Sequence, residues 1–239
     1  MRRRFFVPQF EEKRAVIEGD AAHHLGRVLR AEAGQLYELS DGRQVWLGRV
    51  SSVARDRVEF ALVEELTSRR SSVDVTLLLA VVKFDAFEWA IEKATELGVN
   101  AIVPLAAARS EKALLSAAAK RAERWKKILV EASQQSRRLS VPSLGALTRP
   151  EQSFAQQGEE LKLLLSERQD APTLRTLLEG EKSSNVVIAI GPEGGWTDKE
   201  LESATQSGFN QVSLGNLILR TETAVIAALA NLNYALGAE

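Results

Sequence analysis

The spacing of hydrophobic and polar residues changes character near residue 70. Before it, short alternating stretches at Gln35–Leu39, Val45–Val53 and Val58–Val63 predict β-strands, and Asp41-Gly42 between the first two is a strong hairpin signal. One short helix is expected over Asp20–Arg30, capped by its first residue, because three apolar side chains share one of its faces. We therefore predict a small β-barrel in residues 1–70.

After the polar stretch Thr67–Ser72, apolar strands alternate with helical patterns. Val73–Val82 is almost continuously apolar, as expected of a strand that is covered on both faces. Further strands are predicted at residues 101–105, 161–165, 186–190 and 212–214, and helices at 84–97, 116–135, 197–207 and 221–236. Residues 139–158 read as connectors. The alternation predicts an α/β domain over residues 73–239, with a mostly parallel sheet between two layers of helices.

The strand at residues 186–190 ends in Gly191-Pro-Glu-Gly-Gly195, and Thr197-Asp-Lys-Glu200 is a capping box that starts the next helix. Parallel sheets bind ligands beyond the carboxyl ends of their strands. The glycines would let backbone N–H groups approach a ligand, although a tight strand-to-helix turn explains them equally well. The chain lacks both the lysine of a phosphate-binding P-loop and an early Gly-x-Gly-x-x-Gly, which argues against a nucleotide-dependent enzyme.

A second glycine loop, Ser213–Ala224, leaves the next strand along the chain. It contains an apolar stretch, then Arg220, and it enters a helix with Glu222 in the first turn. Two such loops at adjacent strand ends would surround one crevice with apolar walls, backbone amides, an arginine and one or two acids. Adenine, a ribose and a charged amino-acid tail would be satisfied there.

These motifs resemble the SPOUT superfamily of RNA methyltransferases, and most closely its bacterial 16S ribosomal RNA uridine-N3 methyltransferases. The resemblance covers nearly the whole chain. Its strongest parts are Ile190–Gly195 and Leu214-Gly215 with Ile218–Ala224, supported by His24–Arg30 and Ile91–Val99. The chain departs from the pattern at Asn216-Leu217, where one RNA or cofactor contact is missing, and at Trp196, which is bulkier than expected.

The resemblance implies a PUA-like barrel followed by a SPOUT domain with a deep trefoil knot. It further implies a homodimer, the cofactor S-adenosylmethionine, and methylation of N3 of one uridine in the decoding region of the small subunit. The cofactor-binding residues that we expect are Leu165, Gly191, Pro192, Glu193, Gly194, Leu214, Gly215, Ile218, Leu219, Thr223 and Ala224. A non-catalytic ribosome assembly factor that retains the pocket is the alternative function.

For catalysis we expect Arg220 to stabilise negative charge on the uracil or to clamp a phosphate. Glu222 is either a general base or a partner of the helix dipole. Because N3 lies on the Watson–Crick edge, the target has to be unpaired, and a basic surface has to hold the RNA. The RNA-binding candidates are Arg2, Arg3, Arg4, His24, Arg27, Arg30, Lys83 and Arg138.

Composition adds few constraints. The net charge is −1, and there are no cysteines, so disulfides and thiolate metal sites are excluded; we expect no metal. No apolar run has the length of a membrane span, and we expect no signal peptide and a cytoplasmic location. The last helix is apolar almost all round, which fits either a dimer interface or a central core helix.

Overall fold

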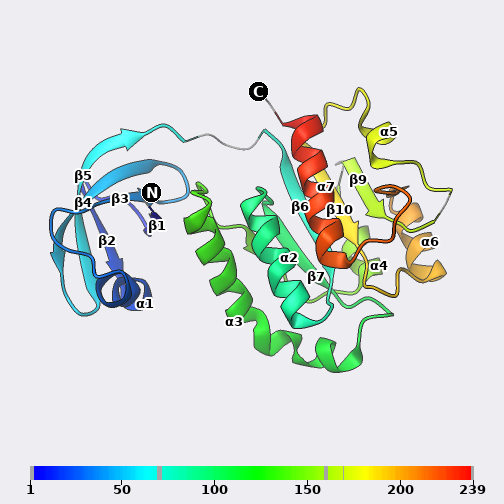
Figure 1. The fold of residues 1–239 in the computed structure, drawn as a ribbon, viewed down its shortest axis with the longest axis horizontal. Coiled ribbons are helices and arrows are strands. Elements are labelled where there is room, and N and C mark those ends of the chain that lie inside the picture. The colour runs from blue at the N-terminus through cyan, green and yellow to red at the C-terminus, as the bar shows by residue number, and fades with distance from the viewer. Residues whose placement is uncertain (1–2, 69–71, 159–160, 169, 238–239) are drawn as a thin grey trace. The chain divides into compact units, whose positions relative to one another are not determined.

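The computed structural model describes residues 3–68, 72–158, 161–168 and 170–237 (Figure 1). The chain forms two compact units. The first contains residues 1–70 together with 133–141, and the second contains residues 71–132 and 142–239. Arg2 and the middle of the predicted polar stretch Thr67–Ser72 lie outside the described residues.

The first unit is built on a five-stranded sheet with the order β1-β3-β4-β5-β2. Its strands are β1 (Arg4–Phe6), β2 (Arg14–Glu18), β3 (Leu36–Ser40), β4 (Val45–Val53) and β5 (Arg57–Leu66). The predicted hairpin is confirmed: β3 and β4 pair antiparallel, and the Asp41 carboxylate accepts hydrogen bonds from the backbone N–H groups of Arg43 and Gln44 at 2.8 Å each. The pattern did not show β1, which pairs in parallel with β3 across more than thirty residues.

The single helix predicted over Asp20–Arg30 is wrong in form. The segment is one α-helical turn, α1 (Gly19–His23), followed by a wider π-type turn, η1 (His24–Val28), and Glu18 occupies the N-cap position. The amide of Leu29 bonds the carbonyl of His24, five residues back, at 3.0 Å. Within this wider turn Leu25 is fully buried in the core of the unit, while His24, Arg27 and Val28 are exposed.

A distant segment, Ser133–Val141, completes the first unit. The buried guanidinium of Arg4 pairs with Glu38 at 3.0 Å and donates to the carbonyl of Arg137. The hydroxyl of Ser40 donates to the carbonyl of Leu139 at 2.6 Å. Part of what the sequence presented as a connector is therefore integral to this unit, because it satisfies polar groups of β1 and β3.

The second unit is a six-stranded parallel sheet with the order β11-β9-β10-β6-β7-β8, which confirms the predicted parallel sheet. Its strands are β6 (Asp74–Ala80), β7 (Ala101–Leu105), β8 (Ser143–Leu144), β9 (Leu161–Leu165), β10 (Asn185–Ile190) and β11 (Asn210–Val212). Its helices are α2 (Phe84–Glu96), α3 (Lys112–Gln135), α4 (Pro150–Ala155), α5 (Leu174–Leu178), α6 (Asp198–Gln206) and α7 (Thr221–Leu236). α3 ends in the segment that belongs to the first unit.

Helices cover both faces of this sheet (Figure 1). On one face, alternate residues of β10 join Phe154 of α4 and Ala204 of α6 in one apolar cluster. On the other face, α7 packs on β10 and on α2, and Asn233 donates to the carbonyl of Leu97 at 2.7 Å. All residues of β10 after Asn185 are buried, as the apolar sequence requires. The trefoil knot stays a prediction.

Candidate ligand pocket at three strand ends

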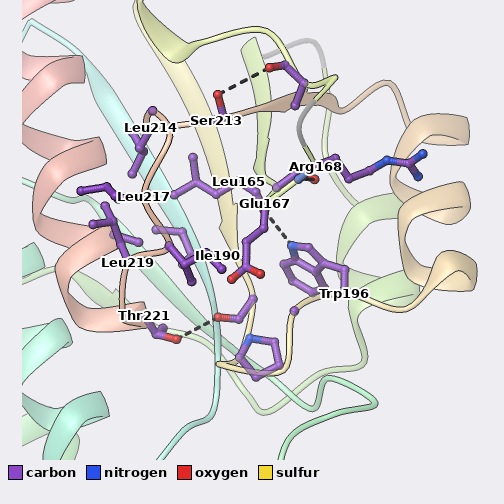
Figure 2. Close-up of a pocket in the computed structure, with 18 of the residues that line it drawn as sticks. Leu165, Glu167, Arg168, Ile190, Trp196, Ser213, Leu214, Leu217, Leu219 and Thr221 are labelled. Atoms are coloured by element: carbon purple, nitrogen blue, oxygen red, sulfur yellow. Dashed lines mark hydrogen bonds between the residues drawn. The ribbon is translucent and has the colours of Figure 1, made fainter.

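A pocket of about 670 Å³ lies beyond the carboxyl ends of β9, β10 and β11 (Figure 2). The first glycine loop and the second glycine loop line it together, so the predicted common crevice is confirmed. Its lining comprises Arg109, Leu165, Ser166, Glu167, Arg168, Ala171, Thr173, Ile190, Gly191, Pro192, Gly194, Gly195, Trp196, Leu201, Ser213, Leu214, Gly215, Asn216, Leu217, Ile218, Leu219, Thr221 and Ala224.

The strand order differs from the sequence-based expectation. The two loops do not leave adjacent strands, because β9 lies between β10 and β11 and pairs in parallel with both. A short segment that follows β9, residues 166–168, therefore enters the pocket between the two loops. No local motif marks this segment, so the sequence could not place it there.

The first glycine loop is held by Trp196. Its indole is nearly buried, packs edge-to-face on Phe154, and donates from Nε1 to the carbonyl of Leu165 at 2.9 Å. A Cβ added to Gly191 would lie only 3.0 Å from the same indole. Glycine at 191 thus leaves room for the indole, and because Gly191 also lines the pocket, both explanations that the sequence left open for this position stay open.

The carboxylate of Glu200 connects this loop to the end of β7. Glu200 is buried and completes the predicted capping box: one carboxylate oxygen accepts from the Thr197 amide at 2.8 Å and from the Thr197 hydroxyl at 2.7 Å. Its other oxygen accepts from the backbone N–H of Ala108 at 2.9 Å. Beside it, Arg109 donates to the carbonyl of Gly194 at 2.6 Å. The loop after β7 is therefore a brace for the first glycine loop.

The second glycine loop has fewer contacts with the rest of the described chain than the first. Gly215 has a φ of +126°, a conformation that other residues rarely adopt. Leu217 and Ile218 are 82% and 78% exposed. Within the described chain, no hydrogen bond holds residues 214–219. The loop is anchored at its ends, by Ser213 on one side and on the other by the Thr221 hydroxyl, which donates to the carbonyl of Gly191 at 3.1 Å (Figure 2).

Most of the predicted cofactor residues line this pocket; Glu193 and Thr223 do not. The two predicted catalytic residues are also outside the lining. Arg220 is exposed at the N-cap position of α7, and Glu222 is half-buried in its first turn. Both are chain neighbours of the lining residue Thr221. Sequence reasoning missed Arg109, Glu167 and Trp196 as lining residues.

Charged groups in the pocket differ in their partners. Arg109 is engaged by the Gly194 carbonyl, and Arg168 pairs with Asp170 at 3.3 Å. Glu167 is the one acidic residue among the lining residues of the described chain. Figure 2 shows its carboxylate pointing into the pocket between Ile190 and Trp196, whereas Arg168 points away.

The predicted RNA-binding residues lie mainly in the first unit. Arg3, His24, Arg27 and Arg30 are exposed there, whereas Arg4 is buried in its pair with Glu38. Arg138 is half-buried, and burial lowers its pKa from the ordinary arginine value. Lys83, in the second unit, is exposed at the N-cap position of α2.

Two further features concern the whole described chain. In that part, no group of three or more histidine, cysteine, aspartate or glutamate side chains is arranged to hold a metal ion. None of the helices in the same ranges has the length and apolar character needed to span a membrane.

A parallel sheet with a pocket beyond its strand ends, joined to a small β unit, defines an α/β ligand-binding protein with an appended β domain. Models of two families match: an RNA methyltransferase domain at residues 69–233 and an RNA methyltransferase PUA domain at residues 17–63.

Curated relatives and solved structures narrow the class. The chain is 38% identical to the ribosomal RNA small subunit methyltransferase E of Synechocystis, in an alignment that covers 88% of this chain and 70% of the relative. It is 33% identical to the Bacillus subtilis protein of the same name, with 91% of this chain and 89% of the relative covered. A crystal structure of the Neisseria gonorrhoeae protein of that name, bound to S-adenosylmethionine, superposes with a TM-score of 0.89 at 30% identity and covers 99% of both chains. A methyltransferase from Legionella pneumophila, in complex with the same cofactor, also reaches 0.89 at 31% identity and covers 100% of both. The chain belongs to the ribosomal RNA small subunit methyltransferase E family.

Proposed function

We propose that this protein uses S-adenosylmethionine to methylate N3 of one uridine in the decoding region of 16S ribosomal RNA. The observation that carries the proposal is the pocket at three strand ends, in a chain whose structural relatives of the same fold bind that cofactor. The pocket volume lies within the range of about 300–1,000 Å³ that small-molecule sites have. Residues 1–70 would bind RNA and residues 73–239 would carry the catalytic site.

The lining fits the cofactor in chemistry as well as in size. Leu214, Leu217 and Leu219 form an apolar wall suited to a flat base, and the glycine loops expose backbone groups for the polar parts. We propose that the cofactor also contacts further lining residues, namely Leu165, Gly191, Pro192, Gly194, Gly215, Ile218 and Ala224. Glu193 and Thr223 would act from outside the lining, by shaping the two loops.

When bound, S-adenosylmethionine supplies a methyl group on a positively charged sulfur. Methylation of uracil N3 forms one C–N bond at the expense of one C–S bond, and the proton on N3 is released. Arg220, exposed beside the pocket, would stabilise the negative charge that the uracil gains as this proton leaves. Glu222 would accept the proton or, as a first-turn acid, would stabilise α7.

The RNA-binding surface would include Arg3, His24, Arg27 and Arg30, which are exposed in the first unit, with Lys83 and Arg138. For Arg4 we propose a structural role, because its guanidinium is buried against Glu38. Arg2 remains a candidate by sequence. Such a surface predicts RNA affinity that falls steeply with salt, since basic side chains displace counterions from phosphates.

A homodimer would cover apolar groups that the single chain leaves in water. Leu217 and Ile218 of the second glycine loop are exposed, and so is Tyr234 of α7, at 91%. Light scattering at micromolar concentration measures the state directly, and a monomer would rule the dimer out. Because its substrate would be ribosomal RNA, we place the protein in the cytoplasm.

The function is tested by incubating the purified protein with isotope-labelled S-adenosylmethionine and small-subunit particles or 16S RNA that lack the modification. We expect one labelled uridine, located by mass mapping, whose methyl group is on N3. Arg220→Ala should lower turnover about 100-fold with little change in cofactor affinity, since the charge that it stabilises develops in the transition state. Cofactor binding without label transfer to either RNA substrate would favour the assembly-factor alternative.

A further inference from the structure

Glu167 lies in the pocket without a role in the fold. It is exposed, and no hydrogen bond or ion pair joins its carboxylate to another residue of the described chain. The two arginines of the lining are engaged elsewhere, Arg109 by a backbone carbonyl and Arg168 by Asp170. Its carboxylate is therefore the acidic group of a lining that also contains two engaged arginines, hydroxyl and amide side chains, leucines, glycines and an indole.

The backbone around Glu167 is held from two sides. Leu165, two residues earlier, accepts the indole N–H of Trp196 through its carbonyl, and the amide of Ser166 donates to the carbonyl of Val212 at 2.9 Å. The end of β9 is thus tied both to the first glycine loop and to β11. Glu167 consequently leaves the sheet from a fixed point and points between Ile190 and Trp196 (Figure 2).

We propose that Glu167 is the counter-charge for the cationic part of the methyl donor and makes the pocket selective for positively charged adenosyl ligands. This inference rests on the proposed function. A carboxylate attracts a sulfonium or ammonium group more strongly in a partly water-excluded pocket than in bulk solvent. The indole of Trp196 lines the same pocket, and the face of an aromatic ring attracts cations. The apolar wall across the pocket would accept the uncharged adenine.

The experiment compares three ligands by titration calorimetry. S-adenosylmethionine carries a charged sulfur and an ammonium group, S-adenosylhomocysteine carries the ammonium group only, and methylthioadenosine carries neither. We expect Glu167→Gln to lower the affinity for S-adenosylmethionine about 10- to 100-fold, because it removes one partner of a charge pair. The affinity for methylthioadenosine should change less than about twofold. Quenching of the protein's tryptophan fluorescence, to which Trp196 in the pocket lining contributes, provides a second measure of binding.

Two further variants separate charge from shape. Glu167→Asp keeps the charge on a shorter side chain and should restore much of the S-adenosylmethionine affinity. Glu202→Gln makes the same chemical change on the exposed face of α6, outside the pocket lining, and should leave all three affinities unchanged. A loss with Glu202→Gln as large as with Glu167→Gln would reduce the effect to overall charge and overturn the proposal.

Each pattern of affinities has one reading. If Glu167→Gln lowers the affinity for S-adenosylmethionine alone, the carboxylate faces the sulfonium. If the variant also lowers the affinity for S-adenosylhomocysteine, the carboxylate faces the ammonium group. Both outcomes support the proposal. An equal loss of affinity for methylthioadenosine, or no loss of affinity for any of the three ligands, overturns the proposal. If the unaltered protein binds S-adenosylmethionine normally while Glu167→Gln has no effect, only this inference fails. If the unaltered protein binds none of the three, the proposed function fails with it.

Discussion

The two glycine loops that line the pocket differ in how they are held. The first, residues 191–196, is fixed by the indole of Trp196, by Arg109 and by the capping box that Glu200 completes. The second, residues 213–219, leaves Leu217 and Ile218 in solvent and is bonded only at its ends. One wall of the pocket is thus held by the core, and the other is a loop that the described chain holds only at its ends.

This contrast teaches that similar sequence motifs need not have the same mechanical role. We expect the first loop to be preformed and to change little when a ligand binds, because its contacts are buried and satisfied. We expect the second loop to adjust on binding, because few contacts within the chain oppose its movement. Substitutions in the first loop should then lower the stability of the fold, and those in the second should lower ligand affinity more than stability.

Trp196→Ala should have the largest effect on stability. It empties a buried site and leaves the carbonyl of Leu165 without its donor, so we expect a loss of roughly 4 kcal/mol in the free energy of unfolding. Urea unfolding followed by circular dichroism measures it. Trp89→Ala on α2, where the side chain is 45% exposed, is the matched control and should cost about 1 kcal/mol or less. Equal losses would contradict the idea of a core-built wall.

Glu200→Ala should have the second largest effect on the stability of the fold. It removes a capping-box partner and the acceptor of the Ala108 amide, and we expect a loss of about 3 kcal/mol. Hydrogen exchange should show faster opening of residues 106–110 together with the first glycine loop. The same change at the exposed Glu202 should stay within about 0.5 kcal/mol. Faster exchange in the second glycine loop alone would show that the brace acts elsewhere.

A pair of glycine substitutions sharpens the comparison between the loops. In Gly191→Ala the new methyl group meets an indole that cannot retreat, so we expect a stability loss of about 2 kcal/mol. Gly215→Ala meets no neighbouring atom but forces the loop away from a φ of +126°. Because that loop can relax, its stability loss should be about 1 kcal/mol, with cofactor affinity falling about tenfold. Calorimetry and urea unfolding of both variants test the contrast, which a reversed order would refute.

Leu217→Ser and Ile218→Ser should have the smallest effect on stability, within about 0.5 kcal/mol, because both side chains are exposed in the single chain. In the proposed homodimer the same changes should weaken association, seen as a lower mass by light scattering. Val28→Ser, at an exposed valine of the first unit, is the control and should leave the mass unchanged. Intact dimers in both loop variants would remove this loop from the interface.

Local patterns predicted much of the fold because the forces behind them are local. The Asp41-Gly42 hairpin, the capping box at Thr197 and the apolar run of β10 each depend on neighbours within a few residues, and all three appear as predicted. The helix over Asp20–Arg30 was wrong in form, because a π-type turn replaces the α-helix after His23. The segments β1, β2, β8, α4 and α5 were missed, and each of them is six residues or shorter.

The sequence by itself determined the parallel sheet and the two glycine loops, since periodicity specifies which residues are buried. Only the tertiary structure decided that β9 separates β10 from β11, that Ser133–Val141 belongs to the first unit, and that Glu167 points into the pocket. The physical reason is that strand order and long-range pairing depend on contacts between residues far apart in the chain, and no local pattern of side chains encodes them.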